Sequence, residues 1–230
     1  MAETPAIEAL GLSRSYPAQG GRESVSGLRD VSLQVRRGEV VAITGPSGSG
    51  KSTLLFLLAG LDEPDAGSAR IGGVDWQTLR GRKRAAFRRR SCGFIAQGMT
   101  LLPQATAAEN VEVPLVLDAT AAADRAPRVI AALDLVGLTE HGAKMPDQLS
   151  GGQQQRAAIA RAMIIGPAAV LADEPTASLD SATAQDIARL LVDGARRNGT
   201  ALLLVTHDST VAAHADRELR LHSGSAESGG

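Results

Sequence analysis

The residues best suited to chemistry form a short glycine-rich stretch, GPSGSGKST, at positions 45–53. It matches the pattern G-x-x-x-x-G-K-[ST], in which glycines let backbone N–H groups approach phosphate oxygens. Lys51 can reach the β- and γ-phosphates, and the Ser52 hydroxyl can ligate Mg²⁺. A strand pattern precedes the stretch and a helix pattern follows it, which favours a nucleoside triphosphate site over a simple helix cap. The residues expected to contact the nucleotide are Gly45, Pro46, Ser47, Gly48, Ser49, Gly50, Lys51, Ser52 and Thr53.

A pair of carboxylates, Asp173 and Glu174, follows an apolar run. A carboxylate at the end of a buried strand is tolerated where Mg²⁺ neutralises it, so Asp173 and Ser52 are candidate metal ligands. Glu174 is expected to face the neighbouring gap and to polarise an attacking water. Asp-Glu also occurs in surface turns before proline, and Pro175 follows here, but the phosphate loop favours the catalytic interpretation.

A second glycine-containing stretch, LSGGQQQR, occupies positions 149–156. Ser150, Gly151 and Gly152 stand where a helix-forming run begins, and the free N–H groups of a helix N-terminus attract an anion. This chemistry suits stabilisation of the far side of a γ-phosphate. The stretch by itself leaves open which chain supplies that phosphate.

Hydrophobic periodicity predicts the elements that position these residues. Residues 39–44, 168–173 and 201–206 are continuous apolar runs typical of buried strands, and they end in or lead into polar residues. The end of such strands is where an open α/β sheet places its site. The pattern also predicts a half-exposed strand over 31–35 and helices over 52–61, 115–138 and 150–163.

Composition narrows the function classes. The chain has 230 residues and a net charge of −1, so no global field favours nucleic acid. The single cysteine, Cys92, excludes an intrachain disulfide and fits a reducing compartment. The first residues show no signal-peptide pattern, and no apolar run reaches the roughly 18 residues needed to cross a bilayer. We therefore expect a soluble protein that can still lie beside a membrane.

Together these motifs resemble the nucleotide-binding subunits of ABC transporters, most of all those of lipoprotein release and macrolide export. The phosphate loop, LSGGQQQR, VLADEPTASLD and LLLVTHD occur in that family's order, and the subclass rests on GFIAQGMTLLPQATAAENVEVPL. The resemblance implies an α/β fold: a P-loop NTPase core with a mainly parallel sheet, an N-terminal antiparallel β subdomain and an inserted helical subdomain at about 98–165. One domain is expected over residues 1–222, with a disordered tail over 223–230.

The resemblance also implies roles for single residues. Gln97 would sense Mg²⁺ and the attacking water while touching a permease, although Ala96 stands where an aromatic residue is usual. Asp180 would link the two sites of a dimer, and His207 would contact the γ-phosphate. The residues that would act on the partner subunit's ATP are Leu149, Ser150, Gly151, Gly152 and Gln153.

Tyr16, the only tyrosine of the chain, matches the aromatic residue of this family that stacks on adenine. Val25 is expected to pack beside it. Stacking contributes roughly 1–3 kcal/mol per base and does not distinguish the purines, so the preference for ATP over GTP follows from the resemblance alone. The alternative is a half-buried tyrosine beside the turn at Pro17.

Basic residues concentrate in the run RGRKRAAFRRR, at positions 80–90. A solvated helix face is the favoured interpretation, ahead of contact with anionic lipid headgroups beside a docked permease. Nucleic acid is the least favoured partner.

The expected function is ATP hydrolysis that drives a separate membrane permease, docked near Gln97 and residues 101–113. The resemblance implies a homodimer that closes around two ATP molecules with Mg²⁺. The expected location is the cytoplasm of a bacterium, peripheral to the inner face of the cell membrane. One alternative is an ABC ATPase that powers mechanical signalling through its permease. A soluble non-transport ABC ATPase is a more remote alternative.

Overall fold

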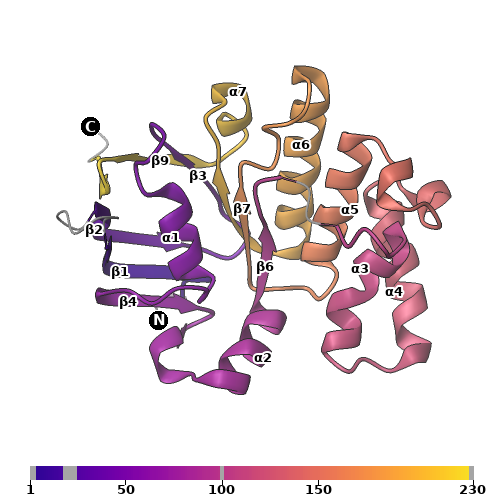
Figure 1. The fold of residues 1–230 in the computed structure, drawn as a ribbon, viewed down its shortest axis with the longest axis horizontal. Coiled ribbons are helices and arrows are strands. Elements are labelled where there is room, and N and C mark those ends of the chain that lie inside the picture. Colours follow the sequence, from indigo (N-terminus) through magenta and orange to yellow (C-terminus); the bar gives the residue numbers. More distant parts are fainter. Residues whose placement is uncertain (1–3, 18–24, 99–100, 228–230) are drawn as a thin grey trace.

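Two β-sheets, with one helix between them and further helices beside the second sheet, make up most of the molecule (Figure 1). The computed structural model describes residues 4–17, 25–98 and 101–227. Among these described residues, no helix is both long and apolar enough to cross a membrane. The two sheets correspond to the expected antiparallel β subdomain and the expected mainly parallel core.

The first sheet is antiparallel, with the strand order β2-β1-β4-β5. Its second strand by sequence contains the predicted 31–35 segment, in which Val31, Leu33 and Val35 are buried while Ser32 and Gln34 are exposed. This alternation buries one face of the sheet, as the period of two predicts. The strands are β1 (Ile7–Tyr16), β2 (Val25–Val35), β4 (Ala66–Ile71) and β5 (Val74–Asp75).

The second sheet has the order β10-β9-β3-β8-β7-β6, and all its pairs except β9 with β10 are parallel. Its central strands β3, β7 and β8 match the three predicted apolar runs to within a residue or two, and their side chains alternate between cores on the two faces of the sheet. The strands are β3 (Val40–Thr44), β6 (Cys92–Ile95), β7 (Ala169–Asp173), β8 (Ala201–Val205), β9 (Arg217–His222) and β10 (Ser225–Ala226).

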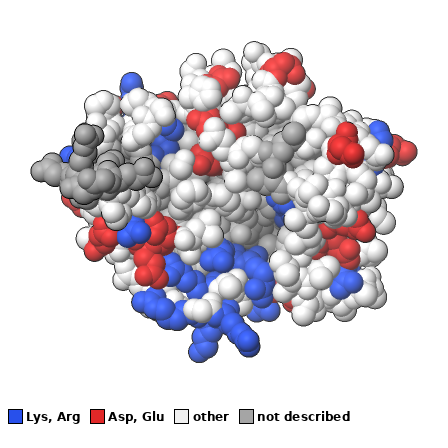
Figure 2. Space-filling model, in the orientation of Figure 1, with Lys and Arg blue, Asp and Glu red and all other residues white. Residues whose placement is uncertain are grey.

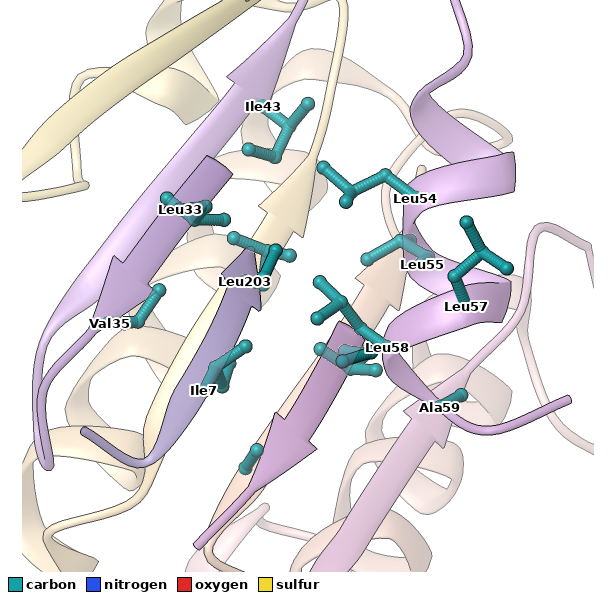
Figure 3. Close-up of a cluster of buried hydrophobic side chains, with 14 of the residues drawn as sticks. Ile7, Leu33, Val35, Ile43, Leu54, Leu55, Leu57, Leu58, Ala59 and Leu203 are labelled. Atoms are coloured by element: carbon teal, nitrogen blue, oxygen red, sulfur yellow. The ribbon is translucent and has the colours of Figure 1, made fainter. Parts of the chain in front are cut away.

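The helix α1 (Lys51–Leu58) lies between the two sheets (Figure 3). All four of its leucines, Leu54, Leu55, Leu57 and Leu58, are buried, because they pack against side chains of both sheets. It ends earlier than the predicted residue 61, since Gly60 adopts a φ of +63° and donates its N–H to the carbonyl of Leu57. Burial between two sheets makes α1 a rigid support for the phosphate loop.

The helices α5 and α6 and the short α7 (Ser209–Ala212) pack on the other face of the second sheet, and α3 and α4 pack against α5 (Figure 1). The predicted helix over 115–138 is two helices, because the chain turns at Ala119, whose φ is +58°. The start of the predicted helix at Ser150 is confirmed. The four helices are α3 (Ala107–Leu117), α4 (Ala122–Leu135), α5 (Gly151–Met163) and α6 (Ser181–Asn198).

The prediction of a disordered tail is wrong for residues 223–227. Ser223 and Gly224 both have positive φ and form a tight turn that joins β9 to β10. The Gly224 carbonyl accepts the Arg29 N–H at 2.7 Å, and its N–H donates to the Ser49 carbonyl at 3.1 Å. These backbone bonds, which composition does not encode, order the turn and attach it to the phosphate loop. Residues 228–230 of the predicted tail lie outside the described residues.

Candidate nucleotide-binding site

The phosphate loop joins the end of β3 to the start of α1, and the surrounding backbone leaves no space for side chains at two of its glycines. A Cβ atom at Gly45 would lie 2.0 Å from the Leu221 carbonyl oxygen, and one at Gly50 would lie 2.1 Å from the Gly27 carbonyl oxygen. Lys51 extends back over the loop, where its ammonium donates to the carbonyls of Gly45 and Pro46, both at 2.9 Å. The Lys51 ammonium therefore lies against the phosphate loop itself, where two neutral carbonyls hold it.

The loop forms one wall of a cleft of about 590 Å³ at the carboxyl ends of the parallel strands. The cleft brings together residues from distant parts of the sequence, as expected for an open α/β sheet. Most of the predicted site residues line it, together with Gly27, which the sequence did not suggest. The lining residues are Tyr16, Gly27, Gly45, Ser47, Gly48, Gly50, Lys51, Ser52, Thr53, Gln97, Asp173, Glu174 and His207.

Two residues of the predicted loop site do not line the cleft with their side chains. Ser49 is only 2% exposed, and its buried hydroxyl has no hydrogen-bond partner among the described residues. Pro46 contributes its carbonyl, which accepts from Lys51 and from the Ser49 N–H.

Asp173 ends β7 inside the cleft and is only 5% exposed. Burial raises the pKa of its carboxyl, and a hydrogen bond from the Ser52 hydroxyl acts in the opposite direction. Lys51 also lowers this pKa through its charge. The two predicted metal ligands, Ser52 and Asp173, are therefore direct neighbours, and a cation between them would offset the cost of burying the carboxylate.

Glu174 and His207 form a pair across the cleft. The Oε2 atom of Glu174 lies 2.8 Å from Nδ1 of His207, and the side chain of Glu174 is 11% exposed against 69% for His207. Glu174 has a φ of +48°, unusual for a residue with a side chain, and its N–H bonds to the Val205 carbonyl at 3.0 Å. The bond to the end of β8 holds Glu174 in this strained conformation.

Tyr16 is fixed by two residues that the sequence analysis missed. Its hydroxyl donates to Oδ2 of Asp62 at 2.9 Å, and the Arg14 guanidinium lies over its ring, 5.1 Å from the centroid. Arg14 in turn donates to both oxygens of Asp62, at 3.0 and 2.8 Å. Asp62 is 46 residues from Tyr16 in sequence, so no local pattern could connect them.

Two further predicted residues stand at the edges of the cleft. Gln97 is exposed, two residues beyond β6, and lines the cleft. Val25 is the first residue of β2 and stands opposite Tyr16 in the strand register. Its side chain lies outside what the structure describes, so packing of Val25 on Tyr16 stays a prediction.

The LSGGQ stretch lies apart from this cleft. Leu149 is buried, whereas Ser150 and Gly151 are exposed, and in the described part of the chain none of residues 149–153 lines the cleft. The Ser150 hydroxyl accepts the Gln153 N–H at 3.3 Å, and the Gln153 side chain accepts the Ser150 N–H at 3.0 Å. These reciprocal bonds cap α5 and hold its first turn at the surface.

Asp180 begins the neighbouring helix α6 in a similar way. Its carboxylate accepts from the N–H and the hydroxyl of Thr183, at 3.0 and 2.7 Å, and these bonds lower its pKa. A Cβ atom at Gly152 would lie 2.8 Å from the Thr183 methyl, so α5 and α6 approach closely at their first turns. The two predicted dimer residues, Ser150 and Asp180, thus sit on adjoining helix ends.

Comparison with known proteins identifies the family. The model of the ABC transporter family matches residues 28–177. The lipoprotein-releasing system ATP-binding protein LolD of Legionella pneumophila (strain Paris) is 47% identical over 214 residues, which cover 93% of both chains. The macrolide export ATP-binding/permease protein MacB of Burkholderia pseudomallei (strain K96243) is 45% identical over 220 residues, 96% of this chain and 33% of that protein.

A solved structure agrees with the sequence relatives. The dimeric, post-hydrolysis ATP-binding cassette MJ0796, bound to ADP and Pi, superimposes with a TM-score of 0.87 at 38% identity, over 96% of this chain and 97% of that one. A second dimeric structure of the same bacterial ABC transporter cassette matches equally well. The chain therefore belongs to the ABC transporter family, and its fold is that of an ATP-binding cassette.

Proposed function

We propose that the chain is the ATP-binding and ATP-hydrolysing subunit of an ABC transporter complex and that it drives a separate membrane permease. The observation that carries the proposal is the single cleft in which the phosphate loop meets Gln97, Asp173, Glu174 and His207. ATP is the nucleotide because the relatives are ATP-binding proteins and the related cassette holds ADP and phosphate. The chain is accordingly an ABC ATPase.

The phosphate loop binds the triphosphate with its backbone N–H groups and with Lys51. The Lys51 ammonium exchanges the neutral carbonyls of Gly45 and Pro46 for anionic phosphate oxygens. Charge-assisted hydrogen bonds are roughly twice as strong as neutral ones, so the exchange favours the bound state. Tyr16 stacks on the adenine at the other end of the cleft.

Ser52 and Asp173 fit Mg²⁺, with Gln97 as a third oxygen donor on the same cleft. Mg²⁺ prefers such hard ligands and keeps waters and phosphate oxygens around it. The described residues contain no cluster of three or more His, Cys, Asp or Glu that could hold a metal. When bound, the ion would neutralise charge on the transferring phosphoryl group.

Glu174 orients the attacking water and accepts its proton. One oxygen of its carboxylate is 2.8 Å from His207, which leaves the other oxygen for the water. His207 is largely exposed and can turn from Glu174 to contact the γ-phosphate. Residues 149–153 do not line this cleft, so they do not reach the far side of that phosphate within their own chain.

A second copy of the chain supplies the missing group. The exposed Ser150 hydroxyl and the N–H groups of Gly151 and Gly152 approach the partner subunit's ATP, and Asp180 links the two sites. The related cassette MJ0796 was solved as a dimer, which supports this arrangement. ATP would then hold two chains together, and its hydrolysis would release them.

The permease docks beside Gln97. A groove of about 260 Å³ runs along β6, the strand that precedes Gln97, and along α3, with exposed apolar side chains such as Leu102 and Leu117 among its lining residues. MacB is by name an ATP-binding and permease protein, which supports the association of this cassette with a permease. We place the subunit at the cytoplasmic face of a bacterial cell membrane.

Measurement of ATP hydrolysis by the purified chain tests this function. Glu174→Gln should bind ATP and lower the hydrolysis rate by about 100-fold or more, because it removes the general base. Glu140→Gln neutralises an exposed carboxylate outside the cleft and should leave the rate unchanged. A wild-type chain without ATPase activity, or equal losses in both variants, would contradict the proposal.

A further inference from the structure

The helix α2 (Gly81–Ser91) and the residue before it carry a concentration of positive charge that the proposed function does not use. Residues 80–90 contain seven arginines and lysines and no carboxylate, in a chain whose net charge is −1. Figure 2 shows these cations gathered on one part of the surface, over the position of α2 in Figure 1. The rest of that face mixes both signs of charge.

The inner side of α2 is attached to the molecule. Phe87 packs edge-on against Trp76, with ring centroids 5.2 Å apart. Arg84 bonds to Glu63 at 2.5 Å and Arg88 donates to the Gly60 carbonyl at 3.2 Å, so both hold α2 to the segment after α1. These basic residues have a structural role, and α2 is a rigid mount for the others.

Three cations at the start of α2 have no such role. Arg80, Arg82 and Lys83 are exposed, and none of them pairs with a carboxylate of the described residues. Among the described residues, Arg80 donates to the carbonyl of its own neighbour Leu79 alone. The three cations stand at the first turn of α2, where the helix dipole disfavours positive charge. Stability of the fold therefore does not account for them.

The same helix reaches the groove assigned to the permease. Arg89, near the other end of α2, lines that groove with Leu102 and Pro114, and its buried Nε atom has no hydrogen-bond partner among the described residues. A surface that borders a permease also faces the headgroup layer around it. We name Arg80, Arg82, Lys83 and Arg89 the basic surface.

We propose that the basic surface binds anionic phospholipid headgroups of the membrane around the permease. The inference rests on the proposed function for its place beside a membrane. A lipid layer fits better than nucleic acid, because the only aromatic residue of α2, Phe87, is turned inward and offers no stacking platform for bases.

Co-sedimentation of the purified chain with vesicles tests the inference. The chain should sediment with vesicles of equal parts phosphatidylglycerol and phosphatidylcholine, and not with phosphatidylcholine alone or in high salt. Each basic residue near an anionic surface contributes about fivefold in affinity, so the triple variant Arg80→Gln, Arg82→Gln, Lys83→Gln should lose roughly 100-fold.

A matched control removes three positive charges elsewhere: Arg36→Gln, Arg37→Gln and Arg128→Gln, all exposed. It should keep at least most of the vesicle binding. Equal losses in both variants, no binding to anionic vesicles, or preferential binding of DNA through the basic surface would each overturn the inference.

ATP hydrolysis in solution separates this inference from the proposed function. The triple variant should hydrolyse ATP at the wild-type rate, because none of its changed residues lines the cleft. A chain that binds anionic vesicles through the basic surface but hydrolyses no ATP would contradict the proposed function and support the surface itself.

Discussion

Tyr16 illustrates how single residues outside the recognisable motifs prepare the site. Asp62 holds its hydroxyl, Arg14 covers one face of its ring, and a Cβ atom at Gly27 would lie 2.8 Å from the ring edge. The ring is therefore immobilised before any nucleotide arrives. An adenine base can stack on the remaining face without an entropic cost for ordering the tyrosine.

Asp62→Ala should weaken ATP binding by about fivefold, a part of the ~1–3 kcal/mol that stacking contributes. Binding of tripolyphosphate, which has no base, should not change. Competition with a fluorescent ATP analogue measures both affinities. Because Tyr16 is the only tyrosine, the fluorine NMR signal of incorporated fluorotyrosine should also broaden or shift in this variant.

Asp65→Ala is the matched control for Asp62→Ala. Asp65 pairs with the same arginine, at 2.8 Å from Nη1 of Arg14, but does not contact Tyr16 in the described structure. It should leave ATP affinity close to the wild-type value. Equal effects of the two substitutions, or an equal loss of tripolyphosphate binding, would show that Asp62 acts on the whole loop rather than on Tyr16.

At the scale of elements, two helices begin with the same device for different purposes. Thr106 and Glu109 cap α3 with reciprocal hydrogen bonds, and Ser150 and Gln153 cap α5 in the same way. The hydrogen bonds at Thr106 serve only to begin α3. Under the proposed function, the N-terminus of α5 also presents the Ser150 hydroxyl and free N–H groups to the partner's nucleotide.

Ser150→Ala and Thr106→Ala should therefore differ in function and agree in stability. Each should lower the free energy of unfolding by about 1 kcal/mol, the usual value of an N-cap, as measured by urea denaturation. Only Ser150→Ala should reduce ATP hydrolysis, by about 100-fold or more, because it removes a donor to the transition state. ATP affinity of the monomer should stay unchanged, and its loss would indicate that Ser150 acts within its own chain.

At the scale of the whole molecule, the cleft holds the residues that bind the nucleotide of its own chain, whereas residues 149–153 lie outside it. Glu174→Gln should accumulate as an ATP-bound dimer, because both half-sites assemble but hydrolysis no longer separates the chains. Gel filtration with ATP and Mg²⁺ measures this, and the wild type should return to monomer as ATP is consumed. The variant should remain monomeric with ADP.

The double variant Glu174→Gln, Ser150→Ala distinguishes ATP-dependent dimer formation from nonspecific self-association. It should stay largely monomeric with ATP, since the partner-facing cap is lost while the cleft can still bind nucleotide. If Glu174→Gln alone elutes as a monomer under saturating ATP, the proposal that a second copy completes the ATP site is wrong, even if the single chain binds ATP.

The sequence by itself determined the features that depend on a continuous piece of chain. The phosphate loop, the Asp173–Glu174 pair and the cap of α5 each arise within a few consecutive residues, where strand, turn and helix preferences dictate geometry. The alternation of apolar residues likewise determined which faces of the strands are buried. These parts of the fold and the site could be predicted.

Only the tertiary structure decided which distant residues touch. The bond from Tyr16 to Asp62, the pairing of Glu174 with His207 and the turn at Gly224 that contacts Ser49 all join separate elements. The same is true of α2. Phe87 and two arginines bind its inner side to the rest of the molecule, and this packing determines which of its cations are exposed. Such contacts depend on strand register and on how α1 packs between the sheets. Those are global properties that no short window of sequence encodes, because each is a sum over many weak interactions.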